Sequence, residues 1–240
     1  MKAQINSIRM NFEVAGPERG PVVVLHHPLA TNLTTWDELT AGLSHKYRVV
    51  RMDARGHGVT EAPPGPYAFE TLAADVVGLM DHLGIKKARF LGLSMGGIVA
   101  MEIMAQAPGR VARLALMDTN PRAEVPEMQA RRQPQIDRAC KGDLATIMRD
   151  EMKPNYLADG PRRAEILDLC MAMALDLGPQ VFARQSRALR DRPDRQDTLR
   201  GVTVPTLVLC GAEDRLCPPE RHDLMHRLIP SSGLTVIPGA

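Results

Sequence analysis

The sequence predicts an α/β fold in which a mostly parallel, doubly wound sheet carries an inserted helical cap. Short apolar or β-branched runs alternate with stretches of helical periodicity over the first half of the chain. That order favours parallel strands joined by crossover helices on both faces. No strand-like run occurs in residues 122–195, and the strand pattern resumes at residue 206. We therefore expect a core of residues 1–121 and 196–240, with residues 122–195 as the cap.

Each expected element follows from its local pattern. The first strand alternates apolar and polar residues, as an exposed strand does, whereas the later ones are short and almost wholly apolar, as buried parallel strands are. The helices repeat apolar residues at helical spacing, and Gly84 ends the first long one. The expected strands are residues 8–14, 21–25, 47–52, 88–93, 111–117, 206–210 and 234–237. The expected helices outside the cap begin near residue 34 and cover residues 69–83, 98–106 and 218–229.

The motif G-x-S-x-G at residues 92–96 lies between an expected strand and an expected helix. Glycines at 92 and 96 remove the Cβ atoms that would collide in a sharp strand-to-helix turn. Such a turn presents Ser94 at the carboxyl end of the strand and aims the Met95 amide toward a developing oxyanion. The alternative is a glycine-rich helix start with a capping serine. We interpret Ser94 as a nucleophile and Met95 as an oxyanion donor.

A second oxyanion donor is expected in the loop that follows residues 21–25. Pro28 has no N–H, so the donor there would be the Leu29 amide. His27 could steady this loop through its ring nitrogens and border the substrate pocket. The alternative is a plain strand-to-helix loop.

The acid that orients a catalytic histidine is expected after a strand that follows the nucleophile in the sequence. Asp214 has that position after residues 206–210, and Asp118, after residues 111–117, is the alternative. We prefer Asp214.

The general base should follow the last strand, but no histidine of this sequence does. His222 and His226 both fall inside the expected helix 218–229, and His57 precedes the serine. We therefore expect the base to be absent from this chain, the C-terminal end to be truncated, and the histidine to come just after Ala240.

Two further side chains are candidates for the substrate pocket. Trp36 could line it or fill the core, and Cys217 lies close to Asp214 but could equally be a packed bystander. The four cysteines have no metal-ligand spacing and are interpreted as reduced thiols, so no metal site is expected.

Composition excludes several function classes. A net charge of +2 favours neither a nucleic-acid nor a membrane partner, and no apolar run approaches the roughly 20 residues that span a bilayer. The N-terminus lacks the apolar core of a signal peptide. The sequence thus indicates a cytoplasmic protein, a monomer or a homodimer, whose partner is a small molecule.

Taken together, these motifs resemble the α/β-hydrolase superfamily. Residues 31–37, and the loop 53–58 followed by residues 63–67, are similar to 3-oxoadipate enol-lactonases, whereas residues 182–194 resemble broader, carboxylesterase-like hydrolases. In such proteins a Gly-His pair soon follows a segment like residues 236–239, and that histidine is the base.

The resemblance implies hydrolysis of a small-molecule ester or enol-lactone through an acyl-enzyme, without a cofactor. Ser94 would attack the carbonyl, the histidine would move the proton, and Asp214 would orient the histidine. The alternatives are a ligand-binding or sensing homologue that does not hydrolyse, and a C–C bond hydrolase or perhydrolase on the same scaffold.

Overall fold

The computed structural model describes residues 1–240 and contains one eight-stranded sheet with the order β1-β2-β4-β3-β5-β6-β7-β8. The strands are β1 (Lys2–Ile5), β2 (Ile8–Ala15), β3 (Val22–His26), β4 (Arg48–Met52), β5 (Ala88–Leu93), β6 (Val111–Met117), β7 (Thr206–Gly211) and β8 (Ser232–Ile237).

Most neighbouring strands are parallel, which confirms the predicted fold class. The pairs from β4 through β3, β5, β6 and β7 to β8 are all parallel, and only β1–β2 and β2–β4 are antiparallel. Strand β1 was not predicted from the sequence; it pairs with β2 across a tight turn in which Asn6 has a positive φ of 50°. Asparagine tolerates that left-handed conformation better than most residues.

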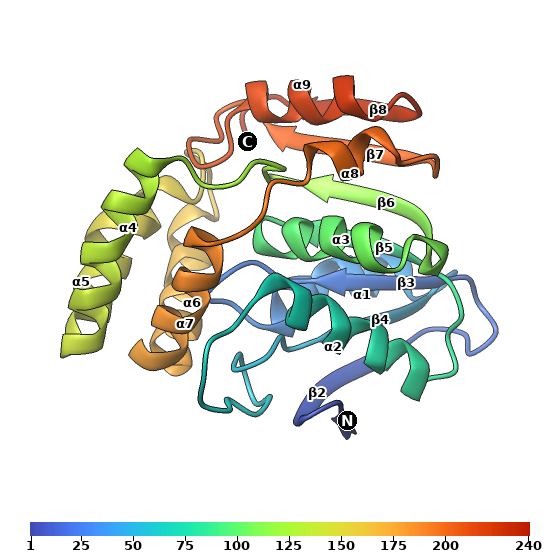
Figure 1. Ribbon diagram of the computed structural model, residues 1–240, viewed down its shortest axis with the longest axis horizontal. Helices are drawn as coiled ribbons and strands as arrows, with labels where there is room; N and C mark the ends of the chain where they lie inside the picture. Colours follow the sequence, from blue (N-terminus) through green and yellow to red (C-terminus); the bar gives the residue numbers. More distant parts are fainter.

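Helices cover both faces of the sheet, and those of residues 126–190 form a separate layer beyond its carboxyl edge (Figure 1). The core helices are η1 (Leu33–Trp36), α1 (Asp37–Leu43), α2 (Phe69–His82), α3 (Met95–Gln106), η2 (Pro108–Arg110), α8 (Gln196–Arg200) and α9 (Pro219–Leu228). The elements between are α4 (Pro126–Arg138), η3 (Ala139–Asp143), α5 (Leu144–Thr146), η4 (Ile147–Met152), η5 (Lys153–Asn155), α6 (Arg163–Leu177) and α7 (Pro179–Arg190).

The segment from α4 to α7, called the cap below, contains helices and no strand. In Figure 1 the arrows of β3, β6 and β7 point toward these helices, and the C-terminus lies at the same edge. Any site at the carboxyl ends of the strands therefore faces the cap. None of the helices is by itself both long and apolar enough to cross a membrane; only α6 and α7 taken together, bent by 100°, pass that test of length and composition.

The core has two parts, one on each face of the sheet. The larger contains buried residues of α2 and α3 packed on the central strands, such as Val99 and Met101. The smaller lies on the other face beneath α1 and consists of Val23, Leu25, Trp36 and Val49.

The two connections to the cap are tied to each other by a buried ion cluster. Glu124, at the entry, bonds Arg132 of α4 at 2.5 Å and Arg192, at the exit, at 3.0 Å. Nearby, the Arg195 amide donates to the Pro121 carbonyl at 2.8 Å. The far end of the cap has weaker links to the core, such as the exposed ion pair between Arg162 and Glu38. The base of the cap is therefore the firmly anchored end.

The turn between β5 and α3 brings three backbone segments into close contact. A Cβ at position 96 would lie 2.1 Å from the His26 carbonyl oxygen, and one at position 92 would lie 2.2 Å from the Gly96 carbonyl oxygen. Only glycine fits at these two positions, because both obstacles are backbone atoms. The start of α3 can therefore press against the end of β3.

Three buried histidines join the loop after β3 to the loop after β4. The ring of His27 lies 5.4 Å from that of His26 and 4.9 Å from that of His57, centroid to centroid. Burial lowers the pKa of His26 and His27 to about 3 and that of His57 to about 4. The cluster is therefore neutral around pH 7.

Substitution of Gly96 tests the backbone contact. Gly96→Ala should lower the free energy of unfolding by about 3 kcal/mol or more, because the methyl group has no space without movement of β3 or α3. Gly109→Ala is the control, since a Cβ there meets no atom within 4 Å. It should change the free energy of unfolding by less than about 0.5 kcal/mol. Urea unfolding measures both, and equal midpoints would contradict the packing described.

The histidine cluster makes stability depend on pH. Because the folded pKa values are about 3 to 4 and the unfolded value is 6.5, the unfolded state binds more protons below pH 6.5. Stability is therefore complete above pH 6.5 and is lost as the pH falls, by about 2 kcal/mol per histidine at pH 5.

Urea unfolding at pH 7.5 and pH 5 should show this loss, and His57→Gln should reduce the difference between the two pH values. His45→Gln, at an exposed histidine, should leave the difference unchanged. An identical pH dependence in both variants would show that His57 is not buried in its neutral form.

Candidate functional site

Ser94 occupies the turn between β5 and α3 in a conformation that few non-glycine residues adopt. Its φ is 52° and its ψ is −113°, and the residue is half-buried. Such a backbone typically costs about 1–3 kcal/mol. Four hydrogen bonds hold it in place: Ser94 N–H donates to Met117 O at 2.9 Å, and Ser94 O accepts from Gly97 N, Ile98 N and Thr119 Oγ1 at 2.9, 3.2 and 2.8 Å. The serine is thus held at the carboxyl edge of the sheet, under the cap.

Two backbone amides at the carboxyl ends of the neighbouring strands β5 and β3 make no hydrogen bond within the protein. Met95 is the first residue of α3, so its N–H has no carbonyl one turn earlier to bond, and it carries the positive end of the helix dipole. Leu29 lies in the loop after β3, and its N–H makes no hydrogen bond within the protein. Both were expected to be oxyanion donors from the sequence.

His27 holds the Leu29 loop and is itself fully buried. Its Nε2 accepts the Ala54 N–H at 3.0 Å, so the ring proton is on Nδ1, which donates to the Pro28 carbonyl at 2.7 Å. Thr31 Oγ1 donates to the same carbonyl at 3.0 Å. Because Pro28 O and Leu29 N–H belong to one planar peptide, these two bonds also fix the direction of the Leu29 N–H. His27 is therefore placed as a support of the loop rather than as a pocket wall.

Asp214 lies in the loop after β7, where backbone amides orient its carboxylate. Leu216 N and Cys217 N both donate to its Oδ1 at 2.8 Å. In the same loop the Glu213 N–H donates to Ala240 O at 2.8 Å. The chain after β8 thus reaches the loop that carries Asp214.

Asp118 ends β6 and lies beside Asp214. Its Oδ1 accepts the Gly211 N–H at 3.2 Å, and burial, followed by the charge of nearby Asp214, raises its pKa to about 6. From the sequence, Asp118 was only the alternative acid, and its proximity to Asp214 was not predicted. Each aspartate follows a predicted strand, and this pattern could have indicated that the two lie close together. The sequence did not show, however, that β6 and β7 are neighbours in the sheet.

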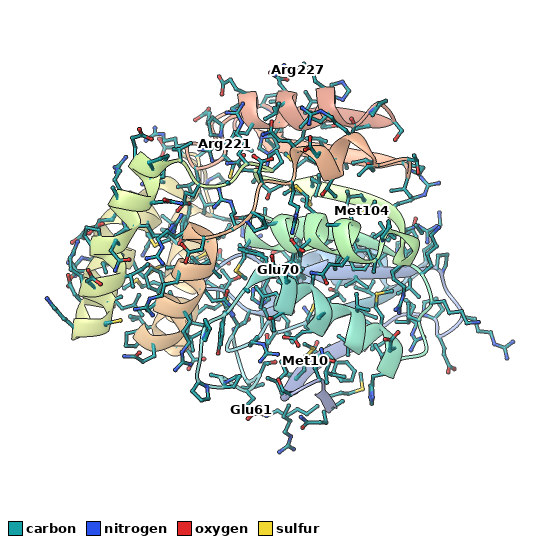
Figure 2. All side chains as sticks on the ribbon, viewed as in Figure 1. Met10, Glu61, Glu70, Met104, Arg221 and Arg227 are labelled. Atoms are coloured by element: carbon teal, nitrogen blue, oxygen red, sulfur yellow. The ribbon has the colours of Figure 1, made fainter.

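None of the seven histidine rings hydrogen-bonds Ser94 or Asp214. His222 Nε2 accepts the Thr119 N–H at 3.2 Å, and His226 Nδ1 lies 2.8 Å from Ser232 Oγ. Both are in α9, as predicted. Arg221, which belongs to the same helix, lies at the end of α9 nearest the cap (Figure 2). His57 is enclosed, and its Nε2 is a buried atom without a partner.

The two other candidate pocket residues have different positions. Trp36 belongs to the core cluster beneath α1, together with Val23, Leu25 and Val49, so we do not propose it as a pocket residue. Cys217 is half-buried next to Asp214, and burial raises the pKa of its thiol to about 12. It remains protonated at neutral pH and is not a nucleophile there.

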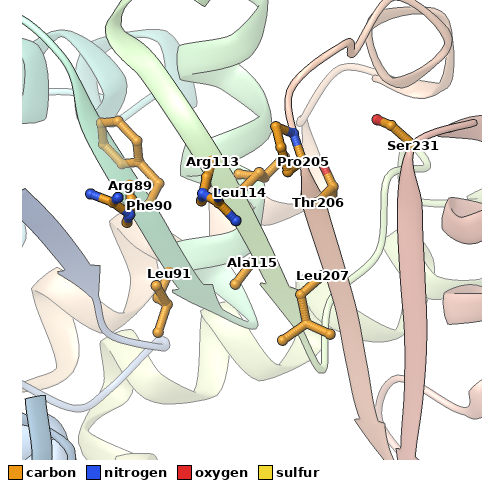
Figure 3. Close-up of a pocket in the computed structure, with 10 residues that line it drawn as sticks. All are labelled: Arg89, Phe90, Leu91, Arg113, Leu114, Ala115, Pro205, Thr206, Leu207 and Ser231. Atoms are coloured by element: carbon orange, nitrogen blue, oxygen red, sulfur yellow. The ribbon is translucent and has the colours of Figure 1, made fainter.

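A surface hollow of about 300 Å³ lies away from these residues. Side chains of β5, β6 and β7 line it, among them Leu91, Ala115 and Leu207, with Arg89 and Arg113 beside them (Figure 3). It contains neither Ser94 nor Asp214. No group of three or more histidine, cysteine or carboxylate side chains is arranged to hold a metal ion.

The chain is similar to several known proteins. Residues 21–143 match the family described as alpha/beta hydrolase fold. The chain is 30% identical over 208 residues to 3-oxoadipate enol-lactonase 2 of Acinetobacter baylyi, which covers 86% of this chain and 76% of that protein. The structure of this chain is similar to that of a thermophilic esterase from Thermogutta terrifontis, with a TM-score of 0.93 and 33% identity. The match covers 100% of this chain and 90% of the esterase chain.

The enol-lactonase from Burkholderia xenovorans is also similar, with a TM-score of 0.90, 30% identity and coverage of 99% and 91%. The elbow at Ser94, the parallel sheet and the helical segment beyond its carboxyl edge agree with these matches. The chain belongs to the α/β-hydrolase fold family.

Proposed function

We propose that this protein hydrolyses a carboxylic ester or lactone of a small molecule through a serine acyl-enzyme. The observation that carries this proposal is the strained turn at half-buried Ser94, together with two unpaired amides: Met95, the first residue of α3, and Leu29, in the loop after the neighbouring strand β3. The relatives named as esterase and enol-lactonase support the same reaction class. They do not favour a binding-only protein, a C–C bond hydrolase or a perhydrolase.

In the proposed reaction, Ser94 Oγ attacks the carbonyl carbon while its proton passes to a histidine. The tetrahedral oxyanion accepts hydrogen bonds from Met95 and Leu29, and each such donor typically contributes about 3–4 kcal/mol to transition-state stabilisation. The histidine returns the proton to the leaving oxygen, and water then hydrolyses the acyl-enzyme by the reverse sequence. Asp214 orients the histidine and stabilises its charged form.

The histidine in this scheme is proposed to follow Ala240. Two observations support this: the seven histidines of residues 1–240 bond neither Ser94 nor Asp214, and Ala240 O accepts the Glu213 N–H beside the acid. A side chain one or two residues later would begin close to Asp214.

Chemical rescue tests the assignment of nucleophile and base together. Residues 1–240 should hydrolyse a 4-nitrophenyl ester very slowly, because loss of the base costs on the order of a million-fold in kcat in a serine hydrolase. Added imidazole should restore part of the rate with saturation, because it can occupy the position of the missing ring. Ser94→Ala should abolish the rescue, and Asp214→Ala should weaken it strongly.

Ser94→Ala is also the background control, since free imidazole attacks activated esters without any protein. A rescued rate unchanged by Ser94→Ala would overturn the nucleophile. Fast, Ser94-dependent turnover without imidazole would instead place the base within residues 1–240, with His57 and His222 as the candidates to substitute next.

A further inference from the structure

One buried histidine ring lies between the chain that holds Ser94 in place and the loop that carries Asp214. His222 belongs to α9, the helix that follows the Asp214 loop, and it is 0% exposed. Its Nε2 accepts the Thr119 N–H at 3.2 Å, and its Nδ1 lies 3.4 Å from Pro218 O. The ring therefore contacts the chain after β6 with one nitrogen and the chain after β7 with the other.

These two contacts fix the position of the ring proton. A backbone N–H can only donate, so Nε2 must offer its lone pair to the Thr119 amide. A carbonyl oxygen can only accept, so the proton lies on Nδ1 and is directed at Pro218 O. Burial lowers the pKa of His222 and so favours the neutral ring that both contacts need. The charged groups that also act on the ring, with smaller effects on its pKa, are Asp214, Arg221 and Asp223.

Thr119 connects the ring to the nucleophile turn. It is 1% exposed, and its Oγ1 donates to Ser94 O at 2.8 Å. Its side-chain atoms would lie 2.7 Å from a Cβ at position 97, so Thr119 also packs against the first turn of α3. The preceding residue, Asp118, has a positive φ of 43°. Because few side chains adopt that backbone conformation freely, the turn depends on contacts such as the one with His222 to keep its shape.

Pro218 ends the loop that carries Asp214. The residue before it, Cys217, donates its N–H to Asp214 Oδ1 at 2.8 Å. Pro218 is the N-cap of α9, and its carbonyl also accepts the Arg221 N–H at 2.9 Å. The contact between His222 and Pro218 O thus holds the chain one residue from an amide that orients the acid.

We propose that His222 is a positioning residue for hydrolysis, a buried neutral ring that joins the turn at Ser94 to the loop of Asp214 and sets the distance between nucleophile and acid. The inference rests on the proposed function, because this distance matters only if a histidine works between those two residues. His222 itself does not serve as the base in this scheme, since its Nε2 lone pair already accepts the Thr119 N–H.

The ring nitrogens and one backbone amide provide a readout that needs no turnover. In residues 1–240 at pH 7.5, ¹H–¹⁵N spectra of the rings should show His222 with its proton on Nδ1 and none on Nε2. His222→Leu removes the acceptor of the Thr119 N–H and should speed the exchange of that amide about tenfold or more. His222→Gln, whose Oε1 can accept the same N–H, should retain the protection. A proton on Nε2 in the parent chain would overturn the proposal.

His226→Leu is the matched control, because it makes the same change at an exposed histidine of the same helix. It should leave the exchange of the Thr119 amide as it is in the parent chain. The amides of β3 should be equally protected in all variants, as a test of the fold. If His222→Leu does not fold, the ring proton of the parent chain and the exchange in His222→Gln decide the question.

Kinetics of the reaction rescued by imidazole separate positioning from catalysis. His222→Leu should lower the rescued kcat by about tenfold to a hundredfold and leave the KM for the ester unchanged, because the acid and the nucleophile lose their alignment. His222→Gln should keep most of the rescued kcat. Thr119→Val, which lacks the hydroxyl that bonds Ser94 O, should also lower it. In the double variant of His222→Leu and Thr119→Val the two losses should be less than additive, because both break the same chain of contacts.

The outcomes distinguish the role of His222 from the reaction itself. If the ring proton is on Nδ1 and His222 protects the Thr119 amide, but rescue does not depend on Ser94, the contacts stand and the proposed reaction fails. If rescue depends on Ser94 and His222→Leu leaves kcat unchanged, only the role of His222 fails. Equal losses of kcat in His222→Leu and His222→Gln would also overturn that role, because a reacting group would need the imidazole itself.

Discussion

The contact on which the site depends is the close approach of the first turn of α3 to the end of β3. It is possible only because Gly96 has no Cβ to meet the His26 carbonyl, and because Gly92 leaves room for the backbone of residue 96. This contact forces the chain to reverse at Ser94 with a positive φ. The strain is retained because four hydrogen bonds and the buried helix α3 over-determine the turn.

The loops after β3 and β4 are joined by a buried histidine. His27 spans the loops after β3 and β4 through Pro28 O and Ala54 N, and it can do so only as a neutral ring. Burial disfavours the charged form of the His27 ring. The neutral ring keeps the Nε2 lone pair that accepts the Ala54 N–H. The direction of the Leu29 amide follows from this neutral histidine.

The charged groups at the base of the cap and those in the turns after β6 and β7 are arranged differently. At the cap, Glu124 lies between Arg132 and Arg192, so buried opposite charges offset the cost of leaving water. In the turns after β6 and β7, Asp118 lies close to Asp214, and burial followed by the Asp214 charge raises the pKa of Asp118 to about 6. The first arrangement anchors the base of the cap, whereas the second makes a carboxyl group harder to ionise.

The sequence by itself determined the α/β class, the positions of the long strands and helices, and the turn at Ser94, because these depend on local periodicity and on glycine spacing. It missed β1, whose pairing depends on a single Asn6 turn, and it left open whether Trp36 lines a pocket or fills the core. Only the tertiary structure decided that Trp36 packs under α1, that His27 supports a loop, and that Asp118 lies close to Asp214. Each of these facts depends on which strands become neighbours and which face of the sheet a side chain enters, and residues far apart in the chain determine both.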